Sequence, residues 1–133
     1  MTSEGQSVIR RFYELSLAGD PACWAQWDGN AVISPPPEFP ETSETSGVEN
    51  IRRYFAEWQS VFGTSWWDGL TLEGVTTLPD GRLIADVTFD LAGKRSGAPF
   101  HKDGAVIYTV RDGRIVRAEH FMDRAAAREA AKA

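Results

Sequence analysis

The spacing of hydrophobic residues changes halfway along the chain. Apolar side chains recur every three or four positions over residues 8–16 and 48–62, which predicts two helices with one buried face each. They alternate with polar residues over 66–77, 83–91 and 100–122, which predicts half-buried strands. Helices followed by a run of strands indicate an α+β domain.

Capping residues set the predicted ends of the helices. Ser3 and Ser46 each precede a Gln or Glu by three positions, the capping-box spacing at a helix start. Gly19 ends the first helix, and Asp20 caps a short second one that follows at once. We expect Asp123 to cap a last, alanine-rich helix that forms a tail on the surface.

The hairpin within residues 100–123 forms the centre of the predicted sheet. A type I turn followed by a left-handed Gly113 predicts a three-residue loop, which pairs Gly104 with His120. This register separates an apolar face from a polar one, whereas a slip by one residue would mix them. The inner face then carries Val106, Tyr108, Val116, Ala118, His120 and Met122, and the outer face carries Asp103, Ala105, Ile107, Arg117 and Glu119.

Composition limits the classes of partner and environment. Residues 1–133 suffice for one domain with a hydrophobic core. A net charge of −5 without a Lys/Arg cluster argues against nucleic-acid and anionic-membrane partners. With Cys23 as the only cysteine, no internal disulfide or cysteine zinc site can form, and we expect a reducing, cytoplasmic environment. We expect neither a signal peptide nor a membrane span.

Aromatic residues predict an apolar pocket. The chain has five Trp and seven Phe, and an aromatic stripe along residues 48–62 would line any cavity between that helix and the sheet. Packing alone also explains such a stripe. The loop Pro35–Thr45 is either a lid over the pocket or a surface excursion. The expected lining consists of Phe12, Trp24, Trp27, Ser34, Phe55, Trp58, Phe89, Val106, Tyr108, His120 and Met122.

Five segments, 11–20, 34–40, 47–51, 93–99 and 109–125, carry a resemblance to a known family. Their order and spacing resemble the SnoaL-like group of the nuclear transport factor 2-like superfamily. The resemblance implies a curved antiparallel sheet, with three helices from the N-terminal half packed over its concave face to form a conical pocket. It also implies a homodimer through the outer sheet face, where we expect Ile84, Ile107 and Phe121 among charged residues.

Two known mechanisms of this superfamily lack their residues here. In ketosteroid isomerase two side chains donate to the oxyanion and an aspartate acts as the base. The two donor positions fall on Phe12 and Val106 here, and the base position falls on Ser34 or Pro35, so none of the three groups is present. The Asp-Arg-Asp set of limonene-type epoxide hydrolases would need Asp86 and Arg117 inside, but the predicted register turns both outward. Neither mechanism is therefore expected.

His120 and Tyr108 are the candidate catalytic pair. A histidine titrates near neutrality and can move a proton, and a tyrosine hydroxyl can hold a carbonyl oxygen. A histidine on an apolar face can equally be a satisfied core residue. Asp123 is a further catalytic candidate, although helix capping accounts for it. His101 is expected to pair with Asp123 across the strands rather than to bind a metal, and we expect no cofactor.

Two hypotheses therefore stay open, and they leave undecided whether the protein is an enzyme. In the first, a SnoaL-like protein accommodates a hydrophobic, cyclic or polyketide-like small molecule and performs cyclase-, isomerase- or hydrolase-like acid/base chemistry. In the second, the domain is a non-catalytic ligand-binding or dimerisation module. A paired carboxylate inside the pocket would favour the enzyme, and the predicted lining contains none.

Overall fold

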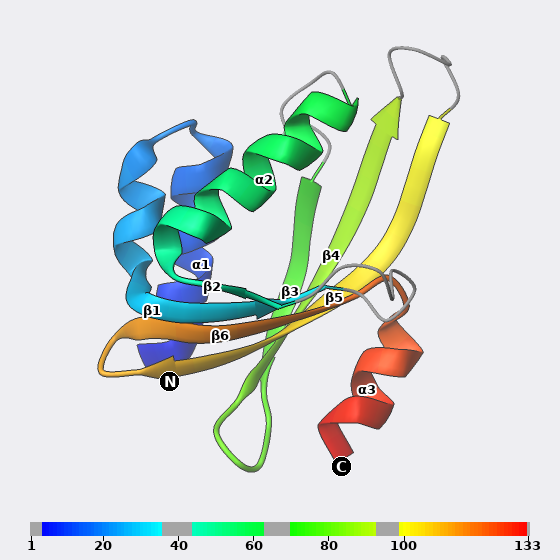
Figure 1. Ribbon diagram of the computed structural model, residues 1–133. Coiled ribbons are helices and arrows are strands. Elements are labelled where there is room, and N and C mark those ends of the chain that lie inside the picture. Colours follow the sequence, from blue (N-terminus) through cyan, green and yellow to red (C-terminus); the bar gives the residue numbers. More distant parts are fainter. Residues whose placement is uncertain (1–3, 36–43, 63–69, 93–98, 133) are drawn as a thin grey trace.

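The computed structural model describes residues 4–35, 44–62, 70–92 and 99–132, with side chains described except at 58–62, 91–92 and 99–102. The expected order of helices and strands is confirmed, with one further short strand (Figure 1). The elements are α1 (Glu4–Leu17), η1 (Pro21–Gln26), β1 (Trp27–Ser34), β2 (Thr45–Ser46), α2 (Val48–Phe62), β3 (Leu70–Thr77), β4 (Leu83–Ala92), β5 (Pro99–Arg111), β6 (Arg114–Phe121) and α3 (Arg124–Lys132).

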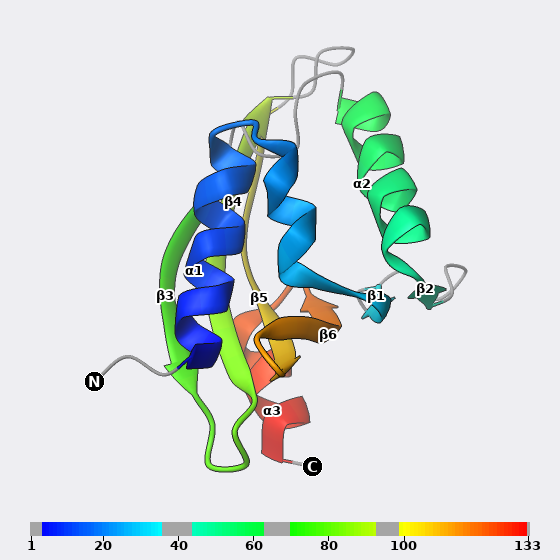
Figure 2. The same cartoon turned by 90° about the vertical axis from the view of Figure 1, so that its left-hand side faces the viewer.

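Six strands form one curved sheet in the order β2-β1-β6-β5-β4-β3. The strands from β3 to β6 make an antiparallel meander, and β1 joins it through a parallel pairing with β6. The sheet is therefore mixed rather than purely antiparallel. After β1 the chain crosses to β3 at the far edge of the sheet, and the meander that starts there brings β6 back beside β1 in a parallel orientation. Figure 2 shows α1, η1 and α2 on one side of the sheet and α3 on the other.

The turn between α1 and η1 follows its sequence signals. Gly19 has a φ of 72°, and its N–H and that of Asp20 donate to the carbonyls of Ser16 and Leu15 at 3.0 and 2.9 Å. This pair of bonds is the Schellman arrangement, which needs a residue in the left-handed region. Asp20 then caps η1 by accepting a hydrogen bond from the N–H of Ala22 at 2.9 Å. The first helix thus reverses where its sequence predicts.

The central hairpin has the predicted faces except next to its turn, and it has a different loop. Asp112 and Gly113 both have positive φ, 51° and 75°, which is the two-residue type I′ turn. A bulge near Val110 then shifts the register, so that Val106 pairs with His120. The predicted three-residue loop and the pairing of Gly104 with His120 were therefore wrong. Because the error is two residues, Val106, Tyr108 and Ala118 keep their predicted face. At the bulge the prediction was wrong, since Ile115 rather than Val116 is buried in the concave core.

Gly104 has a different role from the one predicted. A Cβ atom on this residue would lie 2.7 Å from the carbonyl oxygen of Phe121, so the backbones of β5 and the end of β6 approach too closely for any side chain. The glycine permits this strand contact and does not make room for His120.

The outer face of the sheet is covered by α3. Ala127 is 0 % exposed and packs with Ile84 and Ile107, which are 2 % and 1 % exposed. Arg128 donates two hydrogen bonds of 2.9 Å to the carboxylate of Asp86. The expectations that this helix is a surface tail and that Ile84 and Ile107 are exposed were wrong, because the alanine face of α3 fits against the strands. A homodimer through this face stays a prediction.

Among the described residues, no helix is long and apolar enough to cross a membrane. Within the same ranges, no group of three or more His, Cys, Asp or Glu side chains has the arrangement of a metal site. Most of the loop predicted over Pro35–Thr45 lies outside the described residues, and its last residue belongs to β2.

Candidate ligand site on the concave face

Aromatic rings from the first three helical segments meet above the sheet. The ring of Phe12, on α1, lies 5.3 Å from that of Trp27 and 5.9 Å from that of Trp24. Trp24, on η1, lies 5.7 Å from Phe55 on α2. These edge-on and tilted contacts are the favoured geometries of aromatic pairs. They form an apolar layer over the concave face, and the periodicity of α1 and α2 directs the rings there.

A pair of buried tyrosines links α1 to the sheet. The hydroxyl oxygens of Tyr13 and Tyr108 lie 2.7 Å apart, and the residues are 4 % and 2 % exposed. Burial raises the pKa of Tyr13 and of Tyr108 above the usual value of about 10, so both hydroxyls are neutral at physiological pH. Tyr108 therefore shares a hydrogen bond with another tyrosine and has no hydrogen bond to His120.

His120 presents the polar group of greatest chemical interest on this face. Its ring lies 6.2 Å from that of Phe55, and burial lowers its pKa to about 4, against a smaller opposing effect of a hydrogen bond to the Ser34 backbone. Its Nδ1 atom is buried without a hydrogen-bond partner among the described residues. In a neutral imidazole one nitrogen carries the proton and the other accepts, and the buried Nδ1 has no described partner for either role.

Ser34 faces the other side of the sheet. Its hydroxyl donates to Oε2 of Glu44 at 2.7 Å and accepts from Nη2 of Arg117 at 3.1 Å. Arg117 is paired with Val32 across the strands, whereas the neighbouring pair of Ile33 and Ala118 is buried on the concave side. The expectation that the Ser34 side chain lines the pocket is thus not met, since only its backbone contacts His120.

The remaining predicted residues fall into three groups. Phe89 and Val106 are buried in the concave core. Met122 is half-buried just beyond β6, and Asp123 is exposed, where its Oδ1 accepts a hydrogen bond from the N–H of Ala125 at 3.0 Å. This capping contact accounts for Asp123 without chemistry. The side chains of Trp58 and His101 lie outside the described set.

The comparison with known families agrees with this architecture. Residues 9–118 match the model of the SnoaL-like domain. The chain belongs to the SnoaL-like family. The match ends at Ala118, so His120 and α3 lie just beyond the matched residues.

Solved structures share the fold of this SnoaL-like chain. A candidate isomerase from Bacillus subtilis is 23% identical, with a TM-score of 0.71, over 97% of this chain and 95% of that chain. TerC, co-crystallised with polyporic acid, is 20% identical, with a TM-score of 0.75, over 98% of this chain and 100% of that chain. A candidate SnoaL-like polyketide cyclase from Jannaschia is 15% identical, with a TM-score of 0.73, over 98% and 92%. No curated protein matches the chain significantly.

Two polar residues with distant partners escaped the sequence analysis. Tyr13 lies one helical turn after Ile9 on the buried face of α1, so its spacing could have placed it inside. Glu44 gave no such signal, because its partner Arg117 is 73 residues away in the chain.

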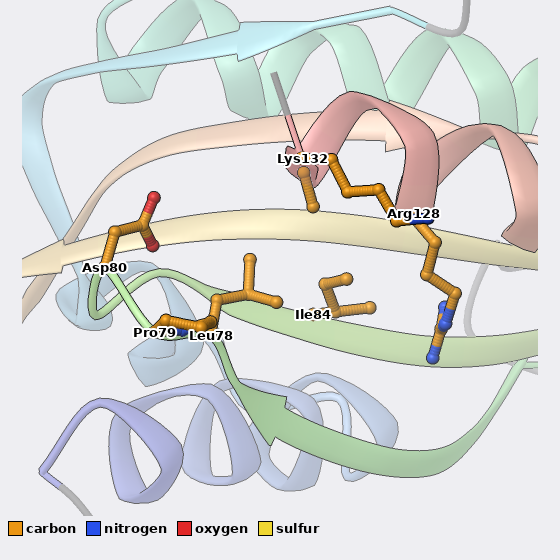
Figure 3. Close-up of a pocket in the computed structure, with 7 residues that line it drawn as sticks. Leu78, Pro79, Asp80, Ile84, Arg128 and Lys132 are labelled. Atoms are coloured by element: carbon orange, nitrogen blue, oxygen red, sulfur yellow. The ribbon is translucent and has the colours of Figure 1, made fainter.

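A separate groove opens on the outer side, between α3 and the β3–β4 turn (Figure 3). Its volume is about 460 Å³, with Leu78 and Ile84 in its floor. Asp80, Arg128 and Lys132, which also line it, are each already in an ion pair, with Arg82, Asp86 and Glu129 respectively. The groove therefore offers less reason for a ligand than the concave face does. A conical pocket on the concave face stays a prediction.

Proposed function

We propose that the concave face of this SnoaL-like protein binds a neutral, apolar cyclic molecule of polyketide-like type. The observation that carries the proposal is the unpartnered Nδ1 of His120, placed next to the aromatic ring of Phe55. A buried polar atom without a hydrogen bond costs about 1–3 kcal/mol, so a ligand group that forms a hydrogen bond with it is stabilised there. The aromatic layer provides the apolar contact area that such sites use.

Charge and structural likeness also support a neutral cyclic ligand. The described side chains that form the concave core are apolar or aromatic, and the ion pairs of Arg117 and Arg128 lie on the outer face. A charged ligand would therefore be desolvated without compensation. A protein of the same fold was co-crystallised with polyporic acid, which is consistent with a cyclic ligand.

The test is a titration followed by tryptophan fluorescence. Trp24 lies within ring contact of Phe55, so a bound ligand is expected to quench its emission. Naphthalene-, anthracene- and flavone-type compounds are added to the wild type, to Phe55→Ala and to Leu17→Ala. We expect saturable quenching, at least about tenfold weaker binding in Phe55→Ala, and no change in Leu17→Ala, because Leu17 is 49 % exposed on α1. Absence of saturable quenching across the panel in the folded wild type would refute the proposal.

Proton transfer by His120 is the second candidate function. A neutral imidazole with a free Nδ1 is in the protonation state of a base, and its low pKa limits how strongly it attracts the proton. The expected measurement is deuterium exchange at the enolisable carbon of a bound cyclic ketone, with His120→Gln about 100-fold slower than wild type. Equal exchange rates at equal ligand occupancy would leave the protein as a binder only.

A further inference from the structure

We propose that the indole N–H of Trp27 is a second polar contact of the ligand site and that it binds a carbonyl oxygen, so that the ligand is a cyclic ketone or a quinone. The inference rests on the proposed function, because it names a further chemical group of the molecule that the concave face would receive. It can fail while the proposed function stands.

The side chain of Trp27 is buried with an unused donor. The residue is 3 % exposed, and its Nε1 atom has no hydrogen-bond partner among the described residues. An indole nitrogen carries a hydrogen and has no lone pair with which to accept, so it can only donate. Buried polar side-chain atoms usually have a partner, and one that has none needs an explanation. A bound acceptor provides that explanation.

The described rings around Trp27 do not supply an acceptor. Its ring lies 5.3 Å from that of Phe12 and 6.3 Å from that of Trp24, and neither side chain has an acceptor atom. The ring of Tyr108, 6.4 Å away, carries a hydroxyl, but this hydroxyl lies 2.7 Å from the hydroxyl of Tyr13. The two tyrosines hydrogen-bond to each other, and the N–H of Trp27 is left over.

The backbone fixes the place of this donor. Figure 2 shows η1 leading directly into β1, and Trp27 is the residue at the junction. Its backbone N–H donates to the carbonyl of Trp24, and it pairs with Ile115 of β6 across the sheet. Because its backbone is bound on both sides and its ring is packed among aromatic neighbours, the indole has little freedom to turn to another partner. The donor is therefore preorganised for a ligand.

Trp27 and His120 belong to one aromatic layer but lie apart in it. Trp24 contacts Trp27 at 6.3 Å and Phe55 at 5.7 Å, and Phe55 contacts His120 at 6.2 Å. Along β6, His120 follows Ile115, the partner of Trp27, by five residues, which is on the order of 16 Å at the usual rise of a strand. A ligand that meets both unpartnered atoms is therefore elongated and carries polar groups in two separate places.

A neutral carbonyl is the acceptor that suits these surroundings. The described residues of the concave core, of which Trp27 is one, are mostly apolar or aromatic, so a carboxylate there would lose its hydration without a compensating charge. A ketone or quinone oxygen is neutral and can accept the indole N–H. A ligand without an acceptor would leave the donor unsatisfied. The site should therefore prefer an oxidised ring system to the corresponding hydrocarbon.

The experiment compares 2-acetylnaphthalene with 2-isopropylnaphthalene, which has a similar shape without the carbonyl oxygen. Calorimetry measures the binding of each compound to the full-length wild type, to Trp27→Phe and to Trp24→Phe. We expect the wild type to bind the ketone about tenfold more tightly than the hydrocarbon, and Trp27→Phe to bind the two equally. Trp24→Phe is the matched control, because it removes a half-buried indole of the same layer and should keep the preference for the ketone.

A measurement on the wild type alone makes the test independent of how the variants fold. The ketone should move the ¹H resonance of the Trp27 indole N–H farther downfield than the hydrocarbon does. An N–H that does not respond to the ketone would mean that the face of the Phe12 ring satisfies it, which would overturn the inference. Equal binding of both compounds by the wild type would overturn it and leave the ligand proposal intact. Binding of neither would also overturn it, and the ligand proposal would then fail only if the anthracene- and flavone-type compounds failed as well.

Discussion

Protonation of His120 should destabilise the protein at a mildly acidic pH where most proteins remain stable. Burial lowers the pKa of this residue from 6.5 to about 4, so the folded state binds a proton less readily than the unfolded chain. The stabilising effect of the neutral ring is complete above about pH 6.5, and it is lost as the pH falls from 6.5 towards 4. Its full size is about 3 kcal/mol, and about 2 kcal/mol is lost by pH 5.

The assay compares urea denaturation of the wild type and of His120→Gln between about pH 7.5 and pH 5. Gln does not titrate, whereas all carboxylates are common to both proteins and cancel in the difference. We expect the stability of the wild type to fall by about 2 kcal/mol more than that of the variant over this range. In a His101→Gln background His120 is the sole histidine, so its NMR titration reports the pKa directly.

Parallel stability curves for wild type and His120→Gln would refute this reasoning. They would mean that water reaches the imidazole and that the ring titrates with an ordinary pKa near 6.5. An accessible, normally titrating histidine would in turn remove the unpartnered buried atom on which the ligand proposal depends. If the NMR titration midpoint of His120 then moved only when a cyclic compound was added, that shift would support the ligand proposal again.

Two further predictions concern the supports of the site. Tyr13→Phe and Tyr108→Phe should each lower the free energy of unfolding in urea by about 1–3 kcal/mol, because each leaves a buried hydroxyl without its 2.7 Å partner. The double variant should lose less stability than the sum of the two single variants, and strictly additive losses would contradict the hydrogen bond. Ala127→Glu should cost about 3 kcal/mol or more and detach α3, because it buries a charge against the sheet, whereas Ala125→Glu on the exposed side of α3 should change stability by less than about 0.5 kcal/mol. Equal melting temperatures for these two variants would argue against the docking of α3.

Local chemistry accounts for what the sequence predicted correctly. The turn at Gly19 needs only a residue that tolerates positive φ, and its neighbours in the chain supply every hydrogen bond. The faces of the central strands follow from the two-residue period, which is insensitive to an even error in register. Val106 and Tyr108 were therefore placed inside correctly although the loop was predicted incorrectly.

Interactions between residues far apart in the chain decided the rest. The pairs Tyr13–Tyr108 and Arg117–Glu44 span 95 and 73 residues, so no local pattern specifies either of them. The position of α3 depends on the fit of its alanine face to Ile84 and Ile107, and the sequence of the helix alone does not specify the surface against which that face packs. The sequence alone therefore determined an α+β chain with an aromatic concave face. Only the tertiary structure decided that Nδ1 of His120 is buried without a partner and that Ser34 turns its side chain to the opposite side of the sheet, because burial and hydrogen bonding across strands exist only once the chain is folded.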